Sequence, residues 1–219
     1  MRMVRGCVDD NRPIPRHGGG MSTIPIILLA AGQSSRMRGT DKLLQQVDDM
    51  PLLRRAALIA LDAGPVIVAL PPEPHARYDA LDGLPVQIVP VPDAAEGMNA
   101  SLRTAMQHLP AEASEVIVLL ADLPELTSSD IKTVAQSVVK DAGFLIHRGT
   151  TSDGKPGHPV AFDRSLFPEL RALSGDEGAQ TVVKRHKDRV KLIPLPGDHA
   201  RLDLDTPEAW AAWRAKRDS

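Results

Sequence analysis

Aromatic residues and cysteine are scarce in this chain, whose 219 residues include three Phe, two Trp, one Tyr and one Cys. So few aromatic side chains argue against a stacking surface for single-stranded nucleic acid. The lone Cys7 excludes an internal disulfide and any zinc site that needs several cysteines, and it favours a reducing, cytoplasmic compartment. The longest apolar run, over 24–31, is far shorter than the roughly 20 residues that span a bilayer. We therefore expect neither nucleic acid nor a membrane among the partners.

The sequence also lacks an excess of charge of either sign. Its 26 Lys and Arg and 28 Asp and Glu leave a formal net charge of -2. No overall field therefore attracts a polyanion, and any anion site must be local. Aliphatic residues supply most of the 42% hydrophobic content, which is enough for the core of one sizeable domain.

The first 21 residues differ in composition from the rest. Residues 1–20 hold four Arg, two Asp, two Pro and a Gly triplet, with no apolar period. They also lack the apolar stretch of a secretory signal. We predict a flexible N-terminal tail over 1–21 and one folded domain over 22–219.

From residue 24 onward, short aliphatic runs alternate with longer segments of helical period, which is typical of βαβ proteins. The predicted strands are 24–30, 65–70, 85–91, 115–121, 143–148, 158–162 and 190–195. The predicted helices are 52–63, 73–81, 98–109, 129–139, 164–173, 179–186 and 207–216. This pattern predicts an α/β fold, a single three-layer Rossmann-like domain with a mostly parallel sheet, that binds ligands at the carboxyl ends of its strands.

The loop after the first predicted strand concentrates small residues and cations. It reads LAAGQSSRMRGTDKLL over 29–44, where Ala30, Ala31 and Gly32 would let backbone N–H groups approach a phosphate. Arg36 and Lys42 follow in the same loop, although the spacing is neither that of a P-loop nor that of a dinucleotide fingerprint. An ordinary βα turn with solvated cations would also explain these residues.

Carboxylates follow two of the predicted elements. Asp122 ends an apolar strand, where Mg²⁺ or another cation would compensate its charge, or where it forms a turn with the following Leu-Pro. Asp203 and Asp205 lie two apart and share one face if the segment is extended. Asp205 could equally cap the helix that Pro207 opens.

Two further segments carry candidate nucleotide contacts. Gly97, Asn99 and Ser101 begin a predicted helix, where they would either aim polar groups at an anion or ribose or cap the helix. Pro71 and Pro72 follow the second predicted strand, where they shape a base pocket or stiffen the loop.

Six motifs occur in an order that resembles the MobA-like nucleotidyltransferases. They are LAAG-x-S-x-R-M at 29–37, GMNASLRTAM at 97–106, LLADLPEL at 119–126, GKPGHPVAF at 154–162, GDEGAQTVV at 175–183 and LDLDTPEAW at 202–210. The GHP segment resembles the molybdenum cofactor cytidylyltransferase branch. The chain departs from the family at Arg38, which replaces a common Gly, and at 48–50, where Asp-Asp-Met replaces a Gly-containing turn.

The resemblance implies a nucleotide-diphospho-sugar transferase type of fold and a role for each motif. The implied nucleotide-binding residues are Leu29, Ala30, Ala31, Gly32, Ser34, Arg36, Lys42, Pro71, Asn99, Ser101 and Asp122. Arg36, Lys42 and Asp122 are the implied catalytic residues, and Asp122 and Asp205 would hold Mg²⁺. The implied acceptor-binding residues are Lys155, Gly157, His158, Pro159 and Asp176. A lone His is more often structural, and Asp176 could simply cap a helix.

The resemblance further implies a reaction. The enzyme would transfer CMP from CTP to the terminal phosphate of molybdopterin and release pyrophosphate. In the family LAAG accompanies cytidylyl transfer and LAGG guanylyl transfer, and the Ala31 methyl would narrow the space beside the base.

Three alternatives stay open. They are guanylyl transfer from GTP to molybdopterin, cytidylyl transfer to methylerythritol phosphate or a sugar phosphate, and a non-catalytic carrier or maturation protein for the molybdenum cofactor. A recipient molybdenum hydroxylase is a further expected partner.

Overall fold

The computed structural model describes residues 24–141, 143–175 and 178–217. The predicted tail over 1–21 and Asp176 lie outside the described residues. The main sheet has seven strands in the order β5-β4-β1-β6-β8-β7-β9. In that order they are Gln87–Pro90, Val66–Leu70, Ile26–Leu29, Glu115–Leu120, Pro156–Asp163, Ile146–Thr150 and Val190–Pro194.

The sheet is mostly parallel, as predicted. Strand β1 pairs in parallel with both β4 and β6, and all four of its residues are buried. Strand β8 runs antiparallel to both of its neighbours, β6 and β7. The first residues of β8 therefore lie beside the carboxyl end of β6.

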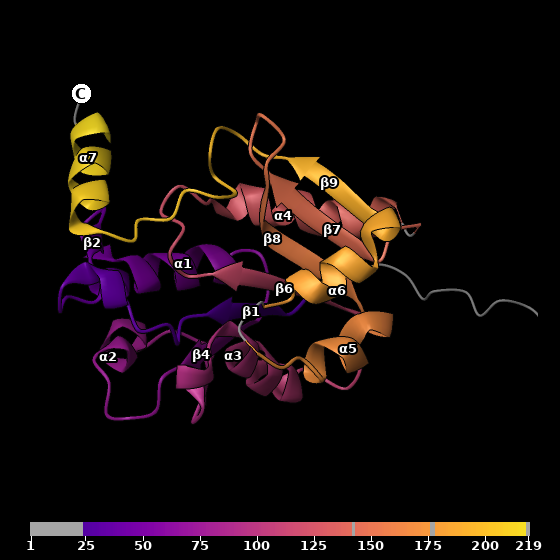
Figure 1. Cartoon of the computed structure of the whole chain (residues 1–219), viewed down its shortest axis with the longest axis horizontal. Coiled ribbons are helices and arrows are strands. Elements are labelled where there is room, and N and C mark those ends of the chain that lie inside the picture. The colour runs from indigo at the N-terminus through magenta and orange to yellow at the C-terminus, as the bar shows by residue number, and fades with distance from the viewer. Residues whose placement is uncertain (1–23, 142, 176–177, 218–219) are drawn as a thin grey trace, which may run out of the picture.

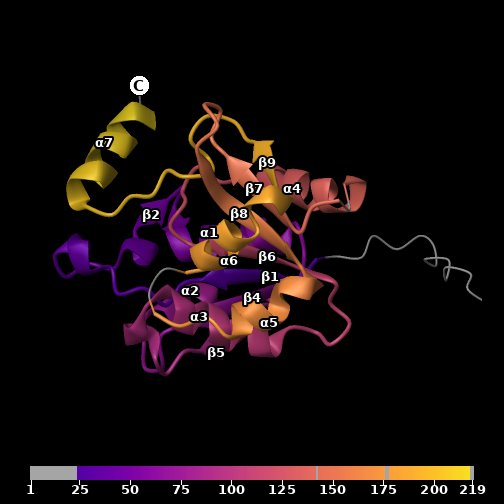
Figure 2. The same cartoon turned by 45° about the vertical axis from the view of Figure 1, so that its right-hand side comes forward.

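Helices cover both faces of the sheet and complete the three layers (Figure 1). On one face, α1 (Leu52–Leu61), α2 (Arg77–Leu81) and α4 (Ser128–Lys140) pack over alternate strand residues such as Ile26 and Leu28. On the other face lie α3 (Met98–Ala105), α5 (Phe167–Arg171) and α6 (Gln180–Arg185). Figure 2 shows α3 and α5 side by side there.

Three predicted helices are shorter than expected by four or more residues. Helix α2 begins only at Arg77, because Pro74 has no backbone N–H to donate and disfavours a helical conformation in the residue before it. The predicted helix over 98–109 ends at Ala105 and continues as a tight 3-10 turn over Met106–His108. The prediction over 164–173 likewise divides into the 3-10 turn Arg164–Leu166 and α5.

A small hairpin was not predicted. Strands β2 (Gln46–Val47) and β3 (Met50–Pro51) are joined by Asp48 and Asp49, which adopt positive φ angles of 51° and 61°. Two consecutive residues with positive φ form the tight turn that matches the twist of the strands. Aspartates therefore occupy positions where glycine is more usual. Arg38 also adopts a φ of 51°, so both departures from the family pattern fall on left-handed backbone.

The last helix, α7 (Pro207–Arg217), stands at one end of the molecule beside β2 (Figure 1). Its Trp210 and Trp213 are buried and pack edge to face. Arg217 pairs with Asp48 of the hairpin at 2.7 Å. This packing positions the preceding segment, which carries Asp203 and Asp205, over the carboxyl ends of the strands. Among the described residues no helix is long and apolar enough to cross a membrane.

Candidate active site

The buried Arg77, which is 1% exposed, supports the loop after β1. Its guanidinium donates to the carbonyl of Ala30 at 2.5 Å and to Ser34 Oγ at 3.2 Å. It also forms a two-pronged ion pair with Asp41, at 2.7 and 2.9 Å. Burial opposes ionisation of Asp41, but the hydrogen bonds and charge of Arg77 lower the pKa of this carboxyl below its usual value. Arg77 therefore fixes both ends of the loop.

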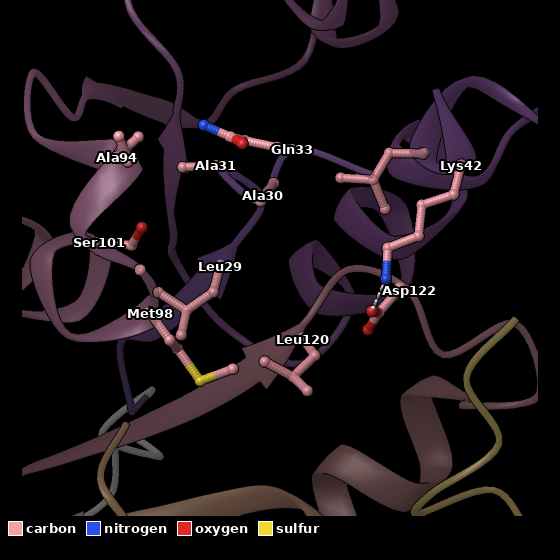
Figure 3. Close-up of a pocket in the computed structure, with 14 residues that line it drawn as sticks. Leu29, Ala30, Ala31, Gln33, Lys42, Ala94, Met98, Ser101, Leu120 and Asp122 are labelled. Atoms are coloured by element: carbon pink, nitrogen blue, oxygen red, sulfur yellow. Dashed lines mark hydrogen bonds and ion pairs between the residues drawn. The ribbon is translucent and has the colours of Figure 1, made fainter. Parts of the chain in front are cut away.

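Asp41 also positions Lys42. Its side chain accepts from the backbone N–H of Leu43 at 2.9 Å and so caps the short 3-10 turn Lys42–Leu44. From this turn Lys42 reaches toward Asp122 at the end of β6 (Figure 3). Its ammonium lies 2.5 Å from Asp122 Oδ2 and 2.7 Å from Asp205 Oδ1. The structure thus brings together three residues that are 163 positions apart at most.

The three side chains are 15–18% exposed, so water screens their charges only partly. Burial lowers the pKa of Lys42, but the carboxylates of Asp122 and Asp205 outweigh it and raise this pKa overall. Burial likewise opposes ionisation of Asp205, but Lys42 and then Arg36 lower its pKa. Lys42 is therefore a cation and Asp205 a carboxylate at neutral pH.

Arg36 and Asp203 complete the charged cluster. Arg36 Nη2 lies 2.5 Å from Asp205 Oδ2, although its side chain is 70% exposed. Burial and the neighbouring carboxylates Asp205 and Asp122 raise the pKa of Asp203. Asp203 thus lies in a partly buried position beside two other carboxylates, where a bound cation would favour its ionised form.

The residues fit a divalent metal. Asp122 Oδ1 is buried and has no hydrogen-bond partner among the described residues, so a ligand atom or ion would satisfy it. The described residues contain no group of three or more His, Cys, Asp or Glu side chains arranged to hold a metal ion by themselves. A pair of carboxylates that leaves the remaining positions to phosphate oxygens and water is the usual arrangement for Mg²⁺.

A cleft of about 350 Å³ opens beside this cluster. The predicted nucleotide-binding residues that line it are Leu29, Ala30, Ala31, Gly32, Lys42, Ser101 and Asp122 (Figure 3). A second cleft of about 570 Å³ adjoins it at Ala31 and Gly32 and is lined by Ser34 and Pro71. No heavy atom lies within 4 Å of the position that a Cβ of Gly32 would take, so the backbone there is open to a ligand.

Asn99 differs from the other predicted nucleotide contacts. It is 1% exposed, and its Nδ2 donates to the carbonyl of Ser174 at 2.7 Å. Its Oδ1 is buried without a partner among the described residues. The structure places this side chain behind the wall of the cleft, where it joins α3 to the segment before α6.

The predicted acceptor segment forms the start of β8, next to Asp122. His158 donates through Nδ1 to the carbonyl of Val118 at 3.3 Å, since a carbonyl only accepts. Burial lowers the pKa of His158 to about 4, so the ring is neutral at physiological pH. Pro159 is buried beside it. The exposed Lys155 instead pairs with Asp153 at 2.8 Å.

Gly157 is needed for packing. A Cβ at this position would lie 2.0 Å from the carbonyl oxygen of Ala200. That oxygen accepts from the N–H of His158 at 2.8 Å. The glycine therefore allows the segment before Asp203 to approach β8.

Sequence reasoning missed Arg77 and Asp41. They are 36 positions apart, and neither belongs to a motif that names a partner. The only available signal was the Asp directly before Lys42 in a loop rich in cations. Their pairing became visible only with the fold.

Comparisons with known proteins agree with this geometry. The profile of the MobA-like NTP transferase domain matches residues 26–190. A protein of Trichormus variabilis named a probable molybdenum cofactor guanylyltransferase is 37% identical over 207 residues, covering 90% of this chain and 94% of that protein. The crystal structure of Rv0371c from Mycobacterium tuberculosis H37Rv has a TM-score of 0.72 and 29% identity, covering 90% of this chain and all of that one.

A second structure of Rv0371c, in complex with manganese, has a TM-score of 0.70 and 27% identity over 87% of this chain and 97% of that one. Together with the sheet order, these likenesses confirm the expected nucleotide-diphospho-sugar transferase type of fold.

Proposed function

Because the chain belongs to the MobA-like NTP transferase family and is a nucleotidyltransferase, we propose that its acceptor is molybdopterin. The enzyme would move a nucleotidyl group from a nucleoside triphosphate to the terminal phosphate of this pterin and release pyrophosphate. The name of the relative from Trichormus variabilis supports this acceptor. The observation that carries the proposal is the position of Lys42 between Asp122 and Asp205, at the mouth of a cleft lined by the loop after β1.

The reaction needs no protein nucleophile. A phosphate monoester is largely ionised near neutral pH, so an acceptor oxygen can attack the α-phosphorus of the triphosphate. A new P–O bond forms there while the bond from the α-phosphorus to the bridging oxygen breaks, and pyrophosphate leaves with that electron pair. The protein supplies alignment and charge compensation.

Arg36 and Lys42 are the proposed source of that compensation. Both side chains are held by Asp205, and Lys42 also by Asp122. In this arrangement they can neutralise the triphosphate and the pyrophosphate that develops from it. The backbone around Gly32 would receive phosphate oxygens.

Asp122 and Asp205 are the proposed ligands of a divalent metal, for which Mg²⁺ is our choice. When held by these carboxylates, such a metal would supply positive charge that offsets the charge of the phosphates. The manganese complex of Rv0371c supports a divalent ion in this family.

CTP is the proposed donor. The Ala31 residue is 3% exposed and lies at the junction of the two clefts, so a methyl group there leaves less room for a purine. A difference of one methyl group in a pocket changes relative rates by about 10–200-fold. GTP is the second candidate, because the relative from Trichormus variabilis is named a guanylyltransferase.

A matrix of CTP, GTP, ATP and UTP against molybdopterin, methylerythritol phosphate and a sugar 1-phosphate tests reaction, base and acceptor together. We expect pyrophosphate release with CTP and molybdopterin. A preference for GTP would overturn the assignment of CTP as the donor but would leave nucleotidyl transfer as the reaction. Binding of molybdopterin without pyrophosphate release would favour a carrier instead.

Ala31→Gly tests the base assignment directly. We expect it to raise kcat/KM for GTP relative to CTP by about tenfold or more. Ala69→Gly is the matched control, because Ala69 is buried in the same core cluster as Ala31 and lines neither cleft. An equal shift in both variants would contradict a role for the Ala31 methyl.

A contact with a recipient molybdenum hydroxylase and a cytoplasmic location stay predictions.

A further inference from the structure

Two arginines bind backbone carbonyls at the start of β8 and have no acidic partner among the residues that the structure describes. Arg148 of β7 donates through Nε to the carbonyl of Gly157 at 3.0 Å. Arg201 donates through Nη1 to the carbonyl of Pro156 at 3.4 Å. Within the part of the chain that the structure describes, neither forms an ion pair. Backbone carbonyls orient these guanidinium groups without neutralising them.

The strand register directs Arg148 toward the active site. Its partner Val160 on β8 also pairs with Val118 of β6, so the three residues lie in one row across the sheet. Arg148 nevertheless bonds to Gly157, which lies three residues nearer the start of β8. Because β8 is antiparallel to β6, the start of β8 lies at the carboxyl end of β6. The Arg148 side chain therefore extends toward the end of the sheet at which Asp122 follows β6.

Arg148 also leaves the sheet on the face that carries the cleft. Its neighbour two positions away, Ile146, belongs to the same core cluster as Leu29 and Val118. Residues two apart on a strand share a face. Leu29 lines the cleft itself, so Arg148 and the nucleotide site lie on one side of the sheet.

Positive charge near this point comes from Arg148 and Arg201. The neutral ring of His158 can accept a hydrogen bond through Nε2 but contributes no charge. Lys155 already pairs with Asp153. Arg148 is half-buried, and burial followed by repulsion from Arg201 lowers its pKa. Two neighbouring guanidinium groups without a counter-ion would both be stabilised by a dianion.

We propose that Arg148, assisted by Arg201, binds the phosphate monoester of the acceptor and presents it to the nucleotide beside Asp122. The ligand class is a phosphate dianion on a larger acceptor, separate from the triphosphate that Lys42 and Arg36 would meet. Among the described residues the Arg148 guanidinium donates through Nε alone, and the planar fork of its terminal nitrogens matches two phosphate oxygens. This inference rests on the proposed function for the identity of the acceptor only.

Arg148→Gln tests the subsite in the full-length chain. Equilibrium binding of molybdopterin and of its dephosphorylated form is measured without nucleotide, and binding of CTP with Mn²⁺ is measured separately. We expect the variant to bind molybdopterin at least tenfold more weakly. The preference for the phosphorylated form should largely disappear, while affinity for CTP changes less than twofold.

Arg54→Gln is the matched control. Arg54 also donates only to backbone carbonyls, those of Ala80 and Asp82, both at 3.0 Å, but it lies on α1 rather than beside the start of β8. We expect it to bind both pterins as the unmodified protein does. If Arg148→Gln does not fold, Arg148→Lys replaces it. We expect an intermediate loss there, because an ammonium cannot hold Gly157 and two phosphate oxygens in one plane.

Unchanged selectivity for the phosphorylated pterin in the Arg148 variant would overturn the subsite while the proposed function stood. Inorganic phosphate, titrated by ³¹P NMR, separates the two proposals further. If the protein binds no molybdopterin but binds phosphate in a way that depends on Arg148, the acceptor assignment fails and the subsite stands. Phosphate binding that is the same in all variants would also overturn the subsite.

Discussion

The two halves of the active-site edge treat positive charge differently. At the ends of β1 and β6, Lys42 has carboxylate partners in Asp122 and Asp205, and Arg77 has one in Asp41. At the start of β8, Arg148 and Arg201 are held by backbone carbonyls alone among the described residues. One half is neutralised before any ligand binds, whereas the other keeps its charge.

The difference matches what each half is proposed to receive. A triphosphate arrives with a divalent metal, so a region that already holds both cations and carboxylates can exchange internal pairs for pairs with the ligand. A phosphate monoester arrives as a bare anion, so the second half offers uncompensated guanidinium groups. Charged groups that are paired when empty also avoid the cost of isolated buried charge.

The largest effect in the paired half should come from Arg77→Met. Loss of this guanidinium leaves Asp41 without its partner and the loop without its support, which should lower the free energy of unfolding by about 3–5 kcal/mol. Urea denaturation measures the change. Arg54→Met is the control and should cost only about 1 kcal/mol, because its hydrogen bonds go to backbone carbonyls. Equal losses would show that the ion pair contributes nothing special.

Lys42→Met should separate catalysis from metal binding. Turnover should fall by about 10²–10³-fold, since a charge that stabilises the transition state is lost. Affinity for Mn²⁺ without nucleotide should rise, because Asp122 and Asp205 lose the ammonium that now lies between them. Pyrophosphate release and Mn²⁺ titration by EPR measure the two effects.

Asp122→Asn is the comparison variant for Lys42→Met and should lose both turnover and Mn²⁺ affinity. Circular dichroism should show that both variants fold. Mn²⁺ binding that is unchanged or weaker in Lys42→Met would contradict the view that Lys42 serves as an internal counter-ion.

In the second half, stability should depend on pH through His158. An ordinary histidine in the unfolded chain titrates near pH 6.5, whereas His158 in the folded chain has a pKa of about 4. As the pH falls from about 6.5 to about 4, the unfolded state therefore binds a proton that the folded state does not. Stability should decrease over this interval, by an amount on the order of 1–3 kcal/mol.

His158→Gln should remove most of that decrease, which denaturation at several pH values would reveal. His108→Gln, a change at an exposed histidine, should leave it in place. A pH dependence that survives in the His158 variant would mean that the ring is not held neutral.

The smallest effect on stability should come from the exposed ion pair between Arg38 and Glu208. Arg38 and Glu208 lie 2.7 Å apart, but their side chains are 73% and 62% exposed. Glu208→Gln should change the free energy of unfolding by less than about 0.5 kcal/mol, and less still at high salt. A loss above about 1 kcal/mol would show that this contact fastens α7 to the loop after β1.

Much of the fold and part of the site followed from local patterns. Most strands of the main sheet are aliphatic runs, although β7 (Ile146–Thr150) has a single aliphatic residue, and the predicted helices carry apolar residues at helical spacing. The loop after β1 and Asp122 were recognisable because each follows a buried strand. The β2–β3 hairpin was missed because its turn uses Asp48 and Asp49 where glycine is the usual signal.

The sequence by itself determined that the chain is an aliphatic α/β domain whose cations and carboxylates gather after its strands. It also determined which motifs carry them. Only the tertiary structure decided which charges neutralise one another, because Lys42 meets Asp205, and Arg77 meets Asp41, through strand order rather than through proximity in the chain. The antiparallel course of β8 likewise brings its first residues, which Arg148 contacts through the carbonyl of Gly157, to the carboxyl end of β6. Pairing of charges depends on distances of a few ångströms, and such distances exist only once the sheet is assembled.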